Sequence, residues 1–308
     1  IGVGKLGVRH LEGILISQLP STIWVVDTND DSISNAYQLT TSINHSCTLN
    51  FCKEIPGKLN FDLAIIATNS RNRFEIVKKL FAKNSVKNLV LEKIIFPIPS
   101  EYTKFKNLID GFNTTCFVNL PRRLFPHYQL IKEFTLNSNS FEATITGSSW
   151  GLLSNSLHFI DLIHFLFFEK CDFIDLSRTT DFFPSKRDGY MEANGGIQLN
   201  YSKRGKVYIE CKEGNFNGIS ISLNFDGKQI EIQENLEGFM KFSWESHERE
   251  IQPLMVTKTT STIFSQLVNK NRCSLPVYND IYKEHQLFIQ EIKNKFQEVS
   301  TENEILIT

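Results

Sequence analysis

Three glycines near the start of the chain have a spacing that suits one kind of chemistry. Gly2, Gly4 and Gly7 form the pattern G-x-G-x-x-G, with Lys5 and Leu6 between the last two. In a dinucleotide-binding turn the first glycine permits a tight turn, the second lets the backbone approach a pyrophosphate, and the third lets a helix pack closely on a sheet. The N–H groups at the start of that helix then bind the anion. The pattern predicts a diphosphate site, although glycines spaced in this way also occur in ordinary loops.

An acidic residue follows the glycines at a suitable distance. Asp27 ends the apolar run Thr22–Val26 and lies 27 − 2 = 25 positions after Gly2. This is close to the roughly 20-residue interval expected for a carboxylate that binds the adenosine ribose. Residues 28–31 contain no Arg or Lys that would neutralise a 2′-phosphate, so the sequence favours NAD over NADP. The alternative is that Asp27 only caps the next helix.

Charge and composition exclude several classes of partner. The 308 residues contain 33 Lys and Arg against 34 Asp and Glu, a net charge of −1, so there is no basic field to attract nucleic acid or an anionic membrane. The six cysteines form no C-x-x-C pair, and no metal site is predicted. The most apolar run, Leu152–Phe168, contains His and Asp and is interpreted as a buried helix.

The cellular location is predicted from the absence of targeting signals. No signal peptide is visible, so we expect a cytoplasmic protein. The glycine turn begins at Gly2 with almost no strand before it. Because a strand usually needs about five residues, we also expect several further residues upstream of Ile1.

The first third of the chain alternates helix and strand. This alternation predicts a doubly wound parallel sheet, a Rossmann domain over residues 1–120. The expected helices are Lys5–Ser17, Asp31–Thr41 and Arg71–Ala82, and the expected strands are Thr22–Asp27, Leu49–Cys52, Phe61–Thr68, Asn88–Leu91 and Cys116–Asn119. Thr68 and Asn69 follow a strand at the edge where parallel sheets bind ligands, so both are candidate cofactor contacts. Arg71 and Arg73 are interpreted as solvated charge at a helix start.

Residues 121–308 are rich in strand signals and predict an α+β substrate domain. Its sheet is expected to be largely antiparallel, with a hairpin turn at Asp226-Gly227. The expected strands are Phe141–Ser148, Gly195–Tyr201, Lys206–Cys211, Ile219–Phe225 and Gln229–Ile232, and the expected helices are Asn155–Phe168, Thr257–Asn269 and Asp280–Glu298. We expect the last helix to pack back on the first domain. An uncovered apolar sheet face would favour a homo-oligomer, a dimer or tetramer.

Four local features together resemble the glucose–fructose oxidoreductase / inositol dehydrogenase / rhizopine catabolism (Gfo/Idh/MocA) family. They are the glycine turn, Asp27, the Ala-Thr pair ending at Thr68, and Glu92-Lys93 after the next strand. The resemblance implies that Glu92 and Lys93 lie at the cofactor, with Lys93 beside the nicotinamide and the substrate hydroxyl. The family usually has Glu-Lys-Pro, and Ile94 replaces the proline here. Either the turn is rebuilt or Lys93 points differently, and the alternative is that Lys93 is an exposed loop lysine.

A second family motif lies in the helix expected from Asn155. The family's D-x-G-x-H-x-x-D is matched at His158 and Asp161, while Ser154 and Ser156 replace the first acid and the glycine. A spacing of three places His158 and Asp161 on one helical face. The resemblance implies that His158 transfers a proton and that Asp161 contacts substrate. Without it, a single His in so apolar a helix is more often a core residue.

Further substrate contacts are expected around these motifs. Arg122 and Arg123 follow Asn119 as in the family, and either contact substrate or phosphate or pair with surface acids. Asn155 shares the helical face of His158. Trp150 and Tyr190 are candidates to flank a sugar ring, although core positions are the stronger interpretation for both aromatic residues.

Oxidation of a secondary alcohol sends a hydride to nicotinamide and leaves a proton that needs a base. Histidine suits this transfer because its unperturbed pKa is near 6.5, and a lysine stabilises charge that develops on the oxygen. The predicted function is an NAD-dependent oxidoreductase of a sugar, cyclitol or nucleotide-linked sugar. The alternatives are a non-catalytic dinucleotide-binding regulator, and an NAD-dependent hydrolase or lyase that uses transient oxidation.

Overall fold

The computed structural model describes residues 1–201, 204–214, 218–235, 240–244, 247–252, 255–300 and 305–307. The chain forms two compact units. Unit 1 contains Ile1–Phe96, Glu101–Pro121 and Leu254–Asp280, and unit 2 contains Pro97–Ser100, Arg122–Pro253 and Ile281–Thr308. The main division after Pro121 lies one residue from the expected boundary. The segment that returns to unit 1 is helix α7 (Val256–Lys270), whereas the last helix, which was expected to return, belongs to unit 2 from Ile281 onward.

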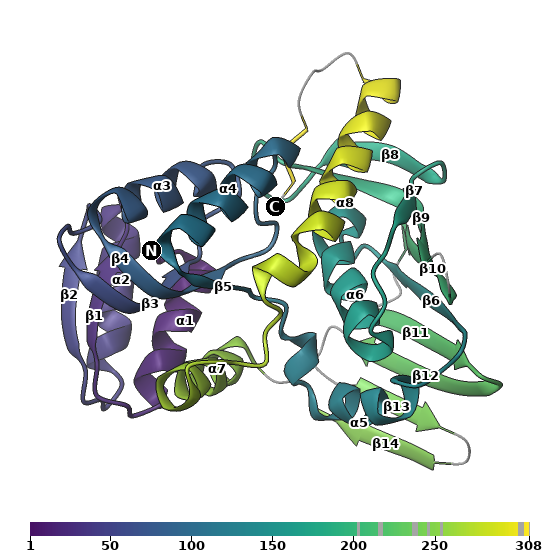
Figure 1. The fold of residues 1–308 in the computed structure, drawn as a ribbon, viewed down its shortest axis with the longest axis horizontal. Coiled ribbons are helices and arrows are strands. Elements are labelled where there is room, and N and C mark those ends of the chain that lie inside the picture. The colour runs from purple at the N-terminus through teal and green to yellow at the C-terminus, as the bar shows by residue number, and fades with distance from the viewer. Residues whose placement is uncertain are drawn as a thin grey trace. The chain divides into compact units, whose positions relative to one another are not determined.

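Unit 1 consists of parallel strands with helices on both faces (Figure 1). Its strands are β1 (Thr22–Val26), β2 (Thr48–Cys52), β3 (Asn60–Ile66), β4 (Ser85–Leu91) and β5 (Thr115–Val118), and its helices besides α7 are α1 (Lys5–Ile16), α2 (Asp30–Thr41), α3 (Arg73–Lys83) and α4 (Pro99–Phe112, in this unit from Glu101). β1 pairs with β2, and β4 pairs with β3 and β5, always in parallel. These parallel strands confirm the Rossmann-like part of the predicted fold class.

The first two residues of the chain connect the two sheets of unit 1. Gly2 N donates to Val26 O of β1 (2.8 Å), and Ile1 O accepts from Ala67 N just after β3 (2.9 Å). A cavity of about 940 Å³ lies between the facing edges of β1 and β3. Val3, Leu11 and Val25 line this cavity and belong to one apolar cluster. The two hydrogen bonds hold the start of the glycine turn between the ends of β1 and β3.

The described residues of unit 2 form a nine-stranded sheet that is antiparallel except for the parallel pair β6 and β10. The strand order is β14-β13-β12-β11-β6-β10-β9-β7, with β8 also paired to β9. The strands are β6 (Phe141–Ser148), β7 (Phe173–Asp175), β8 (Thr179–Pro184), β9 (Met191–Tyr201), β10 (Gly205–Lys212), β11 (Gly218–Phe225), β12 (Lys228–Asn235), β13 (Met240–Trp244) and β14 (His247–Ile251). This sheet confirms the second part of the predicted fold class.

Alternation along the strands of unit 2 separates an apolar face from a polar one. Ile145, Ile209 and Ile221 are fully buried, whereas their neighbours Thr144 and Ser222 lie on the opposite face. Helix α6 (Leu152–Phe167) packs on β9 and β10 (Figure 1), and the other helices of the unit are α5 (Pro126–Thr135) and α8 (Tyr278–Val299, from Ile281) with the short 3-10 helix η1 (Pro121–Leu124). Among the described residues the opposite face carries polar side chains such as Thr144 and Ser222, and the oligomeric state stays a prediction.

The elements expected from sequence agree closely with those observed wherever the apolar pattern is long. β6 has the predicted bounds, and α6, α7 and α8 differ from their predicted bounds by at most three residues at either end. α4, α5 and the short strands β7, β8, β13 and β14 were not predicted. No helix within the described ranges is long and apolar enough to cross a bilayer.

A buried histidine makes the stability of unit 2 depend on pH. His285 in α8 is 1% exposed, and its ring nitrogens have no hydrogen-bond partner among the described residues. Burial, together with the nearby positive charges of Arg123 and His164, lowers the pKa of His285 to about 3. Below pH 6.5 the unfolded chain therefore binds a proton that the folded chain does not, so stability falls as the pH falls.

We expect the free energy of unfolding to decrease by on the order of 2 kcal/mol between pH 6.5 and pH 5 from this histidine alone. Urea unfolding of the wild type and of His285→Phe at both values measures the effect. The variant should lose most of the slope. Equal slopes in the two proteins would show that His285 is already protonated in the folded state.

Candidate functional site

The three glycines of the turn meet three different environments. A Cβ added at Gly7 would lie 1.8 Å from Gly2 O, and one at Gly2, where φ is +79°, would lie 2.7 Å from Thr68 Cγ2. A Cβ added at Gly4 would meet no atom within 4 Å. Gly4 is the N-cap residue of α1, and because glycine has no side chain, no side-chain cap occupies the helix end. Open space therefore adjoins the N–H groups of the first turn, which is where a helix binds an anion. Lys5 and Leu6 are exposed in this turn.

Asp27 lies at the end of β1 and holds the glycine turn. Its Oδ2 accepts a hydrogen bond from Val3 N (2.7 Å), and its Oδ1 accepts one from Asn29 N (2.9 Å). The N-cap of α2 is Asn29, whose Oδ1 accepts from Ser32 N (2.8 Å). The alternative that Asp27 serves only as the cap of α2 is therefore wrong.

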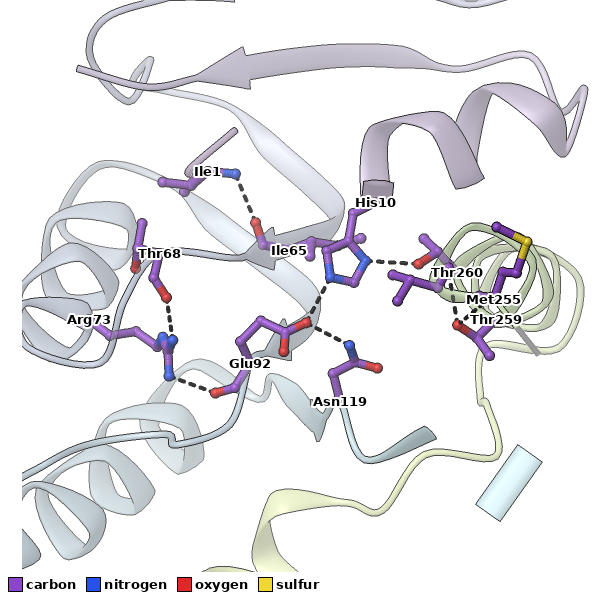
Figure 2. Close-up of polar contacts among 11 residues, drawn as sticks. Ile1, His10, Ile65, Thr68, Arg73, Glu92, Asn119, Met255, Thr259 and Thr260 are labelled. Carbon is purple, nitrogen blue, oxygen red and sulfur yellow. Dashed lines mark hydrogen bonds and ion pairs between the residues drawn. The ribbon is translucent and has the colours of Figure 1, made fainter. Parts of the chain in front are cut away.

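A buried polar network joins the end of β4 to three other elements. Oε1 of Glu92 lies 2.7 Å from His10 Nε2 of α1 and accepts a hydrogen bond from Asn119 Nδ2 after β5 (2.6 Å). His10 Nδ1 lies 2.8 Å from Thr260 Oγ1 of α7. Figure 2 shows these side chains pointing toward one another from their separate elements. Glu92, which was expected at the cofactor, is 5% exposed. Through its hydrogen bonds with His10 and Asn119, its carboxylate links the ends of β4 and β5 to α1.

Two buried oxygens at strand ends have hydrogen-bonding capacity to spare. Thr68 Oγ1 after β3 and Asn119 Oδ1 after β5 have no hydrogen-bond partner among the described residues. Buried polar atoms are normally paired, so these two suit the amide or hydroxyl groups of a ligand. Asn69, the other candidate beside Thr68, is exposed.

Lys93 lies in the segment that follows β4 and is half-buried. The peptide bond between Lys93 and Ile94 is cis, with isoleucine in the place of the family's proline. The guanidinium of Arg73 donates to Glu92 O (2.6 Å) and to Ile95 O (3.0 Å) in the same segment. Arg73 is 1% exposed, so its interpretation as solvated charge is wrong, while Arg71 is exposed as expected.

In unit 2, α6 carries Asp161 into a buried ion pair. Arg123 Nε donates to Asp161 Oδ2 (2.8 Å) and Arg123 Nη2 to Asp161 Oδ1 (2.5 Å), and the carboxylate side chain is fully buried. Burial raises the pKa of Asp161, and the Arg123 charge opposes this rise. Arg122 also forms an ion pair, through Nη1 with Glu234 Oε1, and this oxygen accepts a hydrogen bond from the Tyr128 hydroxyl (2.8 Å). Both arginines thus form ion pairs, but with largely buried acids and not with the surface acids of one alternative. Their contact with substrate or phosphate stays a prediction.

Of the remaining substrate candidates of unit 2, His158 and Asn155 belong to α6, Trp150 lies just before α6, and Tyr190 lies just before β9. His158 and Asn155 are half-buried, and Asn155 Nδ2 donates to Trp150 O (2.5 Å). Trp150 is 7% and Tyr190 is 4% exposed, which are core positions. The structure thus brings Asn155 and Trp150 together, and separates both aromatic side chains from solvent.

Some residues at these sites were not found from the sequence. Glu192 of β9 accepts from Leu153 N (2.9 Å) and Ser154 N (3.1 Å), and so caps α6 where the family motif has an acid at position 154. His10, Arg73 and Asn119 were also missed as contacts. The sequence held one signal for Glu192. Ser154 replaces the acid of the family motif, so another acidic side chain could be expected at the start of α6. Among the described residues, no group of three or more His, Cys, Asp or Glu side chains is arranged to bind a metal ion.

No family model and no curated protein sequence matches the chain. Solved structures do. Levoglucosan dehydrogenase in complex with NADH and L-sorbose superposes with a TM-score of 0.71 at 13% identity, over 96% of this chain and 95% of that chain. The chain shares its fold. An oxidoreductase from Agrobacterium radiobacter in complex with NAD+, L-tartaric acid and magnesium gives 0.68 at 14% identity, over 93% and 92% of the two chains.

A regulatory protein has the same fold. Transcriptional regulator Gal80p from Kluyveromyces lactis superposes with a TM-score of 0.65 at 12% identity, over 96% of this chain and 97% of that chain. The fold is therefore found in dehydrogenases and in a regulator, and the residues of the site have to distinguish the two functions.

Proposed function

We propose that the protein is an NAD-dependent oxidoreductase that acts on a secondary alcohol, or the corresponding ketone, of a sugar, cyclitol or nucleotide-linked sugar. The observation that carries the proposal is the open space at Gly4 beside the N–H groups of α1. Asp27 fixes this turn through its hydrogen bond from Val3 N. The dinucleotides and sugar-like molecules in the similar solved structures support the same ligand classes.

The residues of unit 1 fit a nicotinamide dinucleotide. The first turn of α1 at Gly4, Lys5 and Leu6 would hold the diphosphate, and Asp27 would bind the adenosine ribose. Thr68 and Asn119 would use their spare oxygens on the nicotinamide half. NAD is favoured over NADP because residues 28–31 supply no positive charge. When bound, the dinucleotide would accept or donate the hydride.

The chain's own residues would handle the proton. We assign Lys93 Nζ to donate a hydrogen bond to the substrate oxygen, which stabilises negative charge there. We assign His158 to accept the hydroxyl proton, since an imidazole titrates near neutral pH. Asp161 would act through its ion pair with Arg123, and Asn155 would contact substrate hydroxyls. Lys93 belongs to unit 1 and His158 to unit 2. The two roles are therefore assigned independently, and a substitution at each residue tests its own role.

Calorimetric titration with NAD, NADH and NADPH tests the proposal, followed by turnover assays with a panel of sugars, cyclitols and their ketones. We expect NADH to bind more tightly than NADPH and at least one member of the panel to be turned over. The absence of heat with every dinucleotide would contradict the proposal.

Gly4 offers the most direct variant for the binding step. In Gly4→Val the new Cβ would meet no protein atom within 4 Å, and the side chain would extend into the space assigned to the diphosphate. We expect the Kd for NADH to rise by about 100-fold or more, with the melting temperature within about 2 °C of the wild type. Calorimetry and thermal unfolding measure the two effects. Unchanged affinity would place the diphosphate elsewhere.

A dinucleotide-binding regulator is the second candidate. It is favoured by the similarity to Gal80p and by the motif departures at Ile94, Ser154 and Ser156. Tight binding of NADH without turnover of any member of the panel would support this candidate.

A further inference from the structure

The side chain of Arg73 is buried at the start of α3 and points away from solvent. It is 1% exposed and is among the largest fully buried side chains of the chain. Arginine is rarely buried unless its donors are satisfied. A guanidinium offers five N–H donors in a rigid plane, so the groups that it contacts are fixed relative to one another.

Arg73 donates to backbone carbonyls from two strand ends. Nη1 donates to Glu92 O (2.6 Å), Ile95 O (3.0 Å) and, in a shorter contact, Ile94 O, all after β4. Nη2 donates to Thr68 O, just after β3. Figure 2 shows the guanidinium between Thr68 and Glu92. One cation therefore links the loop assigned to the dinucleotide with the segment that carries Lys93.

The carbonyls that Arg73 binds lie on both sides of Lys93. Residues 92–96 belong to no helix or strand, so no regular hydrogen-bond pattern fixes their backbone. The preceding residue is also fixed through its side chain, because Glu92 contacts His10 and Asn119. The backbone of Lys93 is thus held by Arg73 and, at its amino side, by the Glu92 network.

We propose that Arg73 is a positioning residue that fixes Lys93 for its role at the substrate oxygen. The proposal rests on the proposed function. It adds that the planar guanidinium of arginine is required to hold the backbone on both sides of Lys93. A lysine at position 73 supplies the charge without this geometry. A displacement of about 1 Å at a catalytic group is enough to cost about 100-fold in rate.

The test compares Arg73→Lys and Arg73→Ala with Arg71→Ala, which removes the same charge from an exposed position two residues earlier. For both Arg73 variants we expect kcat to fall by about 100-fold. The KM for the dinucleotide should rise much less, by about tenfold at most, because the glycine turn is intact and only the Thr68 loop loses a contact. Arg71→Ala should keep the wild-type kcat. Wild-type kcat in Arg73→Lys would overturn the proposal.

Hydrogen exchange gives a readout that does not need turnover. We expect faster amide exchange in residues 93–96 of both Arg73 variants and unchanged exchange in α1, with Arg71→Ala matching the wild type. If the wild type turns over no substrate, the proposed function fails but this comparison still decides the role of Arg73. Unchanged exchange in residues 93–96 of Arg73→Lys would show that the guanidinium does not position the segment. If Arg73→Ala does not fold, Arg73→Lys carries the test.

Discussion

Lys93→Ala is expected to lower turnover by about 100- to 10,000-fold, the range typical for loss of a group that handles charge or a proton in the transition state. The Kd for NADH should not change, because the residues assigned to the diphosphate and ribose, Gly4 and Asp27, lie in other segments. Steady-state kinetics on any substrate found in the panel, together with NADH titration, measures both effects.

The alternative that Lys93 is an ordinary loop lysine makes a different prediction. Lys79→Ala, on the exposed face of α3, serves as the control for the loss of one positive charge. If Lys93→Ala and Lys79→Ala both retain wild-type kcat, Lys93 has no catalytic role. If Lys93→Ala raises only KM, the ammonium binds the substrate equally in the ground state and the transition state.

The departure at Ile94 makes this experiment more informative than in a chain with the usual motif. Ile94 is fully buried, so its side chain is part of the packing of unit 1. A retained role for Lys93 would show that buried contacts from other elements can place this lysine. A lost role would favour the regulator, in which catalytic motifs are free to change.

The parts of the site that could be predicted from sequence are those encoded within a few residues. The glycine spacing specifies a turn, and Asp27 follows an apolar strand, so both positions follow from local patterns. The fold class followed from the alternation of helix and strand in residues 1–120 and its loss afterwards. Short strands such as β7 and β13 were missed because three to five residues contain too few alternations to distinguish a strand from a loop.

The contacts that complete the site join residues that are distant in sequence. His10 meets Glu92 82 positions later and Thr260 250 positions later, and no local periodicity records such pairs. Arg73 was assigned to solvent because arginine usually lies there. Its true position depends on carbonyls at the ends of β3 and β4, whose proximity comes from the parallel sheet.

The second prediction with a large effect concerns the ion pair of α6. Asp161→Ala leaves the Arg123 guanidinium, 14% exposed, without the carboxylate that contacts it in a bidentate manner. Removal of one partner from a buried pair typically costs about 3–5 kcal/mol because the other charge stays in a medium that solvates it poorly. We expect the free energy of unfolding of unit 2 to fall by this amount in urea denaturation.

The double variant Asp161→Leu/Arg123→Met provides the control. It removes both charges and fills similar volume, so it should recover most of the stability, and the four proteins form a double-mutant cycle. If Asp161 instead contacts substrate directly, as the family motif implies, Asp161→Ala would change stability by less than about 0.5 kcal/mol and would raise KM. A large loss of stability that the double variant recovers would show that Asp161 positions Arg123 and α6. His158 would then be the residue of α6 to test for proton transfer.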